Sequence, residues 1–349
     1  MKAKSAYAAS KFRYLRLGLA LAVAICSVCC KKPLPARSEL VMGTLCTVNC
    51  YNQGTDELYR EIFARLREIE QLMSASLPGN ELDTLNQLAG VRPLALHQDL
   101  LEVLGKALEY AELSDGAFDP TVGPLVKLWG IGSDAAKIPQ EEEIHQALDL
   151  VDYSNLELDF NAGTGFLKKA GMMVDLGAIA KGYAADEVVK ILEKAQITGA
   201  IVDLGGNVFA YGVKEGAMPW RIGVQNPLES RGSYLGVLEL VNKTIVTSGV
   251  YERFFEADGR RYHHILSTRD GYPVNNALIS VTIIADRSID GDGLSTSIFA
   301  MGYEAGCALV ESLSNVYAIF VFDNQEVRLS SGAEEFFTLT NTDFRLVSN

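Results

Sequence analysis

The sequence predicts an α+β fold in which antiparallel or mixed sheets pack against helices. Three observations support this fold class. Amphipathic helical patterns occupy the first half of the chain, strand patterns dominate the second half, and only two clear helices, at 178–195 and 294–313, interrupt those strands. Because strands mostly follow strands instead of alternating with helices, a doubly wound α/β sheet is not expected.

The individual elements follow from hydrophobic periodicity. The clearest helical pattern runs from Asp56 to Met73, where apolar residues recur every three or four positions with charged residues between them. Weaker helical patterns cover 100–113 and 141–148. Strand patterns cover 40–51, 200–211, 220–224, 235–241, 261–266, 279–285 and 316–322. We therefore expect one large domain over 40–349.

The N-terminus has the pattern of an export signal. Basic residues precede an apolar stretch from Leu17 to Cys30, which is too short to span a bilayer stably. The stretch ends in Cys26, Cys29 and Cys30, and a cysteine at a signal cleavage point is typical of a bacterial lipoprotein; the sequence does not choose among the three. We expect 1–30 to be a signal and lipid anchor, 31–39 to be a linker, and the protein to lie on the periplasmic side of the cell membrane. An ordinary signal peptide and an uncleaved anchor are the alternatives.

Charge and cysteine content argue against two classes of function. The formal net charge is −13, so the chain lacks the basic surface that nucleic acids select, and no nucleic-acid partner is expected. Beyond the leader, the cysteines are Cys46, Cys50 and Cys307, without a C-x-x-C pair or histidines at zinc spacing. We expect buried free thiols and no structural zinc.

The segment from Asp175 to Gly182 combines a short strand, a glycine turn and the start of a helix. Backbone N–H groups at such a helix start form an anion site. Lys181 falls in the first turn, where its charge opposes the helix dipole, and an anion in front of the helix removes that mismatch. The segment therefore indicates a phosphate site, with a solvated lysine on an ordinary helix as the alternative.

Two further glycine-containing segments are candidates. Gly205 and Gly206 interrupt a buried strand pattern, which leaves room for a flat ligand or marks a simple bulge. Asp292 and Thr296 lie four residues apart at a predicted helix start, so their oxygens share one helix face and suit a hard cation such as Mg²⁺. The alternative is that Asp292 caps the helix.

Two adjacent histidines lie in the predicted strand 261–266. Alternation along a strand sends His263 and His264 to opposite faces, so only one of them can face a given site. An imidazole titrates near neutral pH, which makes His264 a candidate general base, with a structural role as the alternative. The sequence has no G-x-S-x-G, Walker A or Rossmann motif, so nucleophilic serine and P-loop chemistry lack their usual support.

Several separated segments, taken together and in order, resemble the ApbE family, the FAD:protein FMN transferases also called Ftp. The resemblance runs from about Met42 to Gly302 and rests on Met42-Gly43-Thr44, Asp115 to Leu125, Asp175 to Gly182, Asp203 to Asn207, Thr247 to Arg253, His264, and Asp292 with Thr296. It implies a T-fold-like core, lipoprotein export, FAD as substrate, and an acceptor flavoprotein whose threonine receives FMN as AMP leaves.

The resemblance also implies residue roles. Mg²⁺ is held by the main-chain oxygen of Ala178 and the side chains of Asp292 and Thr296. The resemblance further implies that His264 lies near the phosphates. Our mechanistic hypothesis is that His264, or alternatively Asp292, takes the proton of the acceptor hydroxyl while Lys181 and the helix start at Ala178 hold phosphate oxygens. The residues assigned to FAD binding are Met42, Ser76, Ala117, Phe118, Asp119, Asp175, Lys181, Gly205, Gly206, Ser248 and His264.

Two positions depart from the family pattern. Ser76 stands where many members have a tyrosine, so a ring that could cover the flavin nucleotide is missing and water enters more easily. Ser267-Thr268 replaces Asp-Pro after His-Ile-Leu, so the fixed φ of proline is lost there. The first alternative function is therefore FAD pyrophosphatase activity, alone or beside transfer. The second is a non-catalytic FAD-binding lipoprotein.

Overall fold

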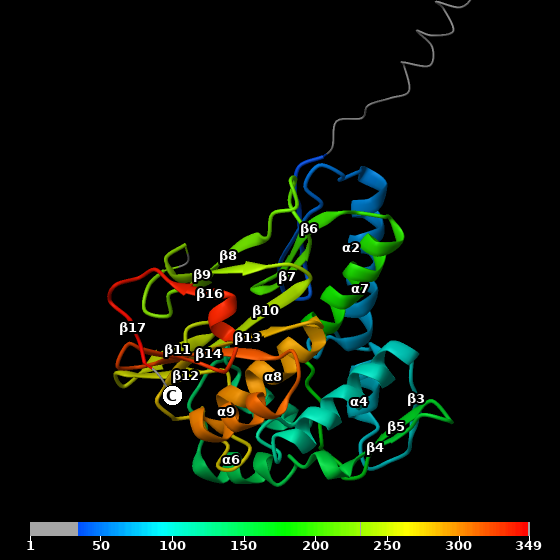
Figure 1. Cartoon of the computed structure of the whole chain (residues 1–349). Helices are drawn as coiled ribbons and strands as arrows, with labels where there is room; N and C mark the ends of the chain where they lie inside the picture. The colour runs from blue at the N-terminus through cyan, green and yellow to red at the C-terminus, as the bar shows by residue number, and fades with distance from the viewer. Residues whose placement is uncertain (1–33, 231, 348–349) are drawn as a thin grey trace, which may run out of the picture. The chain divides into compact units, whose positions relative to one another are not determined.

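The structure is a computed structural model that describes residues 34–230 and 232–347. The described residues from Pro35 onward form one compact unit (Figure 1). The expected signal and lipid anchor over 1–30 lie outside the described residues. In the part of the chain that is described, no helix is long and apolar enough to cross a membrane.

The helices of the described ranges are α2 (Asp56–Met73), α3 (Glu81–Gln87), α4 (Gln98–Leu113), α5 (Gly123–Trp129), α6 (Glu141–Leu148), α7 (Ala180–Lys194), α8 (Ser288–Met301) and α9 (Tyr303–Ser312). The strands are β1 (Arg37–Val41), β2 (Thr44–Asn49), β3 (Leu94–Ala95), β4 (Leu156–Asp159), β5 (Thr164–Leu167), β6 (Gly199–Leu204), β7 (Asn207–Gly212), β8 (Trp220–Gln225), β9 (Tyr234–Leu240), β10 (Lys243–Gly249), β11 (Phe254–Ala257), β12 (Arg260–His263), β13 (Leu278–Ala285), β14 (Tyr317–Phe322), β15 (Glu326–Leu329), β16 (Phe337–Leu339) and β17 (Arg345–Leu346).

A nine-stranded sheet organises the unit, with the order β1-β2-β6-β7-β10-β13-β14-β15-β17. All neighbours are antiparallel except β15 and β17, which run parallel. Helices α2, α7, α8 and α9 contact the sheet strands, as Figure 1 shows. The predicted α+β class is confirmed, because segregated helices pack on a largely antiparallel sheet.

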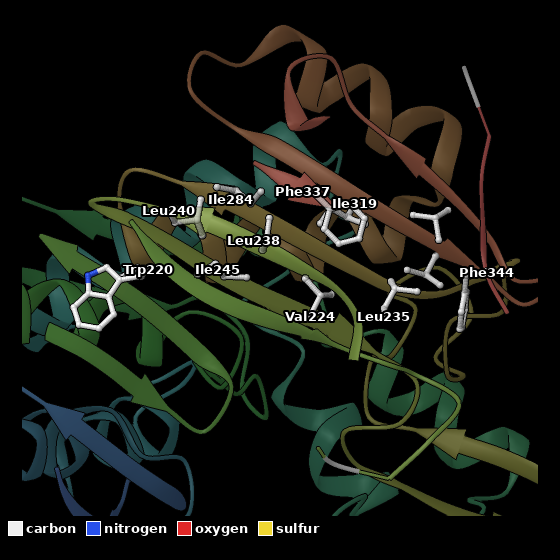
Figure 2. Packing of buried hydrophobic residues seen from close by; sticks show 13 residues of the cluster. Trp220, Val224, Leu235, Leu238, Leu240, Ile245, Ile284, Ile319, Phe337 and Phe344 are labelled. Atoms are coloured by element: carbon white, nitrogen blue, oxygen red, sulfur yellow. The ribbon is translucent and has the colours of Figure 1, made fainter. Parts of the chain in front are cut away.

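The core between the nine-stranded sheet and the small sheet β16-β9-β8 is apolar (Figure 2). Its buried side chains include Trp220, Val224, Leu235, Leu238, Leu240, Ile245, Ile284, Ile319, Phe337 and Phe344. Burying each large apolar side chain contributes about 1.5–3 kcal/mol. This packing fixes β8 and β9 over the sheet, where they form one wall of the cavity described below.

The strand predicted over 40–51 is in fact a hairpin. Met42 and Gly43 both have positive φ, 55° and 68°, and form the two-residue turn between β1 and β2. Such turns match the twist of the paired strands. Since β1 begins at Arg37, it takes up the last residues of the expected linker 31–39.

The strand predicted over 200–211 is likewise a hairpin. Gly205 and Gly206 have φ of 69° and 98° and join β6 to β7, so they make a reversal and not a bulge. The error has a physical reason: an apolar run on both sides of two glycines is common to a bulged strand and to a tight hairpin.

The helix predicted over 294–313 is two helices, separated at Gly302, and the first begins at Ser288. The alternative that Asp292 caps this helix is wrong. Asp186 of α7 accepts hydrogen bonds from the N–H groups of Ser288 (2.6 Å) and Ile289 (3.2 Å), which start α8. Asp292 therefore lies in the second helical turn.

The Asp-Gly-Asp-Gly sequence before the predicted helix 294–313 is itself helical, and both of its glycines are packing positions. A Cβ on Gly291 would lie 2.8 Å from Thr244 of β10, and one on Gly293 would collide with the Tyr110 ring of α4. By contrast, α2 and α6 have the predicted bounds, and α4 starts only two residues before its predicted start.

Candidate functional site

A cavity of about 970 Å³ lies between the nine-stranded sheet, β8–β9 and the loops before α5 and α7. Every site residue predicted from the sequence lines it: Met42, Ser76, Ala117, Phe118, Asp119, Asp175, Ala178, Lys181, Gly205, Gly206, Ser248, His264, Asp292 and Thr296. The fold thus brings residues that are far apart in the sequence, from Met42 to Thr296, into one cavity. The cavity volume is at the upper end for ligand pockets, which suits a dinucleotide.

The starts of α7 and α8 meet at the buried Asp292 carboxylate, which is 3% exposed. The Gly182 N–H donates to its Oδ2 (2.8 Å), and the Lys181 ammonium lies 3.7 Å from its Oδ1. A Cβ on Gly182 would lie 2.8 Å from the Asp292 Cβ, so glycine is what permits this approach. The predicted helix start at Ala178 is corrected to Ala180, and Lys181 remains in the first turn.

Strand β10, which was not predicted from the sequence, orients Thr296, the second predicted metal ligand on α8. The Ser248 hydroxyl lies 2.9 Å from the Ser295 hydroxyl and 3.3 Å from the Thr296 hydroxyl. These contacts hold the Thr296 side chain one helical turn beyond Asp292, on the same face of α8.

The donor set at this point consists of hard oxygens. Asp292 contributes a carboxylate whose Oδ1 receives no hydrogen bond from the described residues, Thr296 contributes a hydroxyl, and Ala178, whose carbonyl oxygen is the third predicted ligand, lines the same cavity. Among residues 34–230 and 232–347, no cluster of three or more His, Cys, Asp or Glu could hold a metal ion. A single carboxylate with neutral oxygens is a different kind of site, and these hard oxygen donors would fit Mg²⁺.

One hydrogen bond determines the tautomer of His264. Its Nδ1 lies 3.2 Å from the Arg253 carbonyl oxygen, which can only accept, so Nδ1 carries the proton and Nε2 keeps its lone pair. Burial, together with the Arg253 charge, lowers the pKa of His264 to about 4. The imidazole is therefore neutral near pH 7.

His263 points elsewhere, as the predicted alternation requires. It is buried, with Nε2 2.9 Å from the Val274 carbonyl oxygen, and does not line the cavity. Burial lowers its pKa as well. Because β12 ends at His263, His264 lies just past the strand instead of within it.

The loop 115–121 is held from beneath by Asp119. Its Oδ1 accepts from the N–H (2.7 Å) and hydroxyl (2.6 Å) of Thr121, and its Oδ2 accepts from the Tyr153 N–H (2.9 Å). Burial raises the pKa of Asp119 against these hydrogen bonds. The carboxylate thus fixes the loop that presents Ala117 and Phe118 to the cavity.

The glycine turn before α7 is organised by Asp175. Its Oδ1 accepts from the Gly177 N–H at 2.7 Å, which closes the turn. Burial raises the pKa of Asp175, and the charges of Arg253 and Lys181 oppose that rise. The two cations give this side of the cavity a positive field.

The two departures from the family pattern have visible consequences. Ser76 is an exposed residue at the cavity, and its small side chain leaves that wall open. The Thr268 hydroxyl donates to the Gly116 carbonyl oxygen (2.7 Å), and the Ser267 hydroxyl accepts from the Arg269 N–H (3.2 Å). Hydrogen bonds therefore fix the loop where proline is absent.

The apolar wall of the cavity was not predicted from the sequence. Ile222, Val224 and Tyr234 of β8 and β9 line the cavity, but as alternating strand residues they resemble ordinary core positions. Arg253 belongs to the segment Thr247 to Arg253, on which the family resemblance partly rests, but nothing in that segment indicated that its charge would face the cavity. These contributions depend on tertiary packing.

Together, the fold and the cavity define an α+β protein with a large pocket that has cations and a helix start on one side and apolar side chains of β8 and β9 on another. Comparison with protein-family models narrows this class. The ApbE family model matches residues 42–320, so the chain belongs to the ApbE family.

Relatives and solved structures agree with that assignment. A Treponema pallidum (strain Nichols) protein named FAD:protein FMN transferase is 40% identical over 314 residues, covering 85% of this chain and 87% of the relative. A Klebsiella pneumoniae (strain 342) protein of the same name is 35% identical over 310 residues, covering 89% and 96%. The ApbE crystal structure from Thermotoga maritima matches with a TM-score of 0.79 at 30% identity, covering 86% of this chain and 98% of that one. The flavin transferase ApbE from Vibrio cholerae matches with a TM-score of 0.78 at 30% identity, with the same coverage.

Proposed function

We propose that this chain is a Mg²⁺-dependent FAD:protein FMN transferase, which cuts the pyrophosphate of FAD, attaches FMN to an acceptor threonine through a phosphoester and releases AMP. The observation that carries the proposal is the contact of Gly182 with Asp292, which joins an anion-binding helix start to a hard-oxygen cluster inside one cavity. The names of the relatives support the same activity.

The two halves of FAD match two parts of the cavity. Lys181 binds phosphate oxygens through its ammonium group and its own N–H in the first turn of α7, because the N–H groups of Ala180 and Gly182 already donate to the Leu176 carbonyl oxygen and to Asp292. Ile222 and Val224 offer an apolar surface on the β8 side, where a flat ring loses water contact favourably. The cavity therefore orients the pyrophosphate toward α8.

The chemical step uses a base and a cation. Ala178, Asp292 and Thr296 would hold a Mg²⁺ ion, which would supply charge neutralisation to the pyrophosphate. His264 Nε2 takes the proton of the acceptor hydroxyl while that oxygen forms a bond to the FMN-side phosphorus. The bond from this phosphorus to the bridging oxygen breaks, and AMP leaves with the electron pair.

The direct test is a transfer assay with full-length protein, FAD, Mg²⁺ and a threonine-containing acceptor protein. A covalently fluorescent acceptor, with the FMN located on threonine by mass spectrometry, is expected. Asp292→Ala should abolish labelling and retain FAD binding. Asp290→Ala is the matched control, since Asp290 binds the Tyr110 hydroxyl (2.5 Å) outside the cavity. Bound FAD with an unlabelled acceptor would favour a non-catalytic flavin-binding protein.

Hydrolysis of FAD to FMN and AMP is the second candidate, because the open wall at Ser76 admits water. AMP release without any acceptor measures this reaction. Ser76→Tyr should lower AMP release in that assay while FAD binding is kept. Equal release from both proteins would remove the link between Ser76 and water access.

We also propose that the protein is exported and lipid-anchored on the periplasmic side of the membrane. The support is the basic and apolar leader that ends in three cysteines. Labelling cells with a palmitate analogue should mark the wild type, and serine substitution at Cys26, Cys29 or Cys30 in turn should identify the lipidated thiol. An unlabelled wild-type protein would contradict the anchor.

A further inference from the structure

The β1–β2 hairpin exposes a pair of leucines. Leu40 is 83% exposed and Leu45 is 55% exposed, and the strand register places them directly opposite each other. We call this pair the hairpin surface. A cross-strand apolar pair of this kind stabilises a hairpin only slightly. That small contribution does not require two side chains as large and exposed as these.

The hairpin surface lies on the cavity side of the nine-stranded sheet. Leu45 and Thr47 are two residues apart on β2 and therefore share a face. Thr47 is directly opposite Asp203 of β6, which lines the cavity. The opposite face of β2 carries Cys46 and Val48, which are fully buried, so the leucines contribute nothing to that core.

The hairpin surface is also adjacent to the cavity along the chain. The turn residues Met42 and Gly43 line the cavity, and each leucine is two residues, about 7 Å of strand, away from one of them. In the described ranges, β1 is an edge strand with β2 as its one neighbour. Its outer edge offers main-chain groups to an extended segment.

Resting on the proposed transfer reaction, we propose that the hairpin surface docks the acceptor protein through apolar side chains next to its target hydroxyl. The hydroxyl belongs to a macromolecule and must enter the cavity, so the acceptor has to cover the surface beside its mouth. The exposed leucines lie on that face, next to the turn that lines the cavity. Covering them with apolar side chains of the acceptor removes both surfaces from water and favours binding at this position.

The test compares a double variant, Leu40→Thr with Leu45→Thr, with the control Leu346→Thr. Threonine keeps strand propensity and removes the apolar surface. Leu346 is 49% exposed on β17, at the opposite edge of the same sheet. The probe is a detergent extract of source-organism membranes from cells that lack this protein. Covalent flavin fluorescence of protein bands and FAD binding by fluorescence quenching are measured for each full-length protein.

We expect the double variant to bind FAD as the wild type does and to label acceptor bands at least tenfold more slowly at limiting extract, while the control labels at the wild-type rate. Labelling by the double variant at the wild-type rate would overturn the docking proposal alone. If the wild type binds FAD but labels no band, the transfer proposal fails and this one fails with it. Should the double variant lose FAD binding, the single variant Leu40→Lys is tested instead. Acceptor labelling at least tenfold slower than by the wild type would then support the docking proposal, and labelling at the wild-type rate would overturn it.

Discussion

Replacement of Gly182 by alanine tests whether close contact of α7 and α8 builds the site. The new Cβ would collide with the Ser288 carbonyl oxygen and lie 2.7 Å from the Ile289 Cα and 2.8 Å from the Asp292 Cβ. Overpacking of this kind costs about 1–3 kcal/mol. Alanine's higher helix propensity returns about 1 kcal/mol.

The balance favours destabilisation, because two of the three obstructing atoms are backbone atoms that cannot rotate away. We expect the free energy of unfolding to fall by about 1–2 kcal/mol, with a decrease in melting temperature of about 2–6 °C. Separation of the helices should also weaken Mg²⁺ binding, since the Gly182 N–H then no longer orients Asp292. Urea denaturation and calorimetric Mg²⁺ titration in the presence of FAD measure the two effects.

Gly306→Ala provides the matched control. Its Cβ would lie 2.7 Å from the Ile298 Cγ2 and 3.0 Å from the Ile298 carbonyl oxygen, so it disturbs the contact of α9 with α8 away from the cavity. It should lower stability and leave Mg²⁺ binding unchanged. A Gly182→Ala protein that is more stable than the wild type and binds Mg²⁺ equally well would refute the packing argument.

Three further outcomes are expected. Arg253→Gln should raise the pKa of His264 above about 4 in an NMR titration, because the Arg253 charge is one cause of the low pKa. In the wild type, the His264 imidazole of the unfolded chain takes up a proton near pH 6.5 and that of the folded protein only near pH 4, so acidification between these values lowers the stability of the fold. This pH range should be narrower in the variant. An unchanged pKa would exclude the electrostatic contribution. Thr268→Val removes the hydroxyl bond to Gly116, which should cost about 0.5–1.5 kcal/mol in urea denaturation and raise the KM for FAD; equal stability would show that the loop needs no such bond. Gly302→Ala, at φ 82°, should cost about 1–2 kcal/mol in thermal unfolding, and a neutral result would mean that the corner between α8 and α9 relaxes freely.

Sequence reasoning succeeded where local signals and tertiary roles coincide. The helix Asp56–Met73 was predicted with its exact bounds because its buried positions repeat with the helical period. The candidate residues on α7 and α8 were found because their motifs combine special backbone positions with polar side chains. The structure brings them into one cavity, and their individual roles stay predictions for the assays above.

The errors arise where glycine has several uses. Gly205 and Gly206 reverse the chain, whereas Gly291 and Gly293 pack inside a helix, and the sequence alone does not distinguish these roles. Strand β10 was missed as well, although it holds Ser248 against Thr296. The apolar wall from β8 and β9 had no motif, because it becomes a wall only when the small sheet packs on the large one.

The way in which α8 is fastened limits how the protein can move. The Asp186 carboxylate accepts a hydrogen bond from the first turn of α8, and the Gly182 N–H donates one to Asp292 in its second turn, so both attachments come from α7. A relative shift of the two helices would break three hydrogen bonds at once. The end of the cavity between α7 and α8 is therefore held as one rigid unit, and any movement that lets a large ligand enter has to come from the surrounding loops and strands.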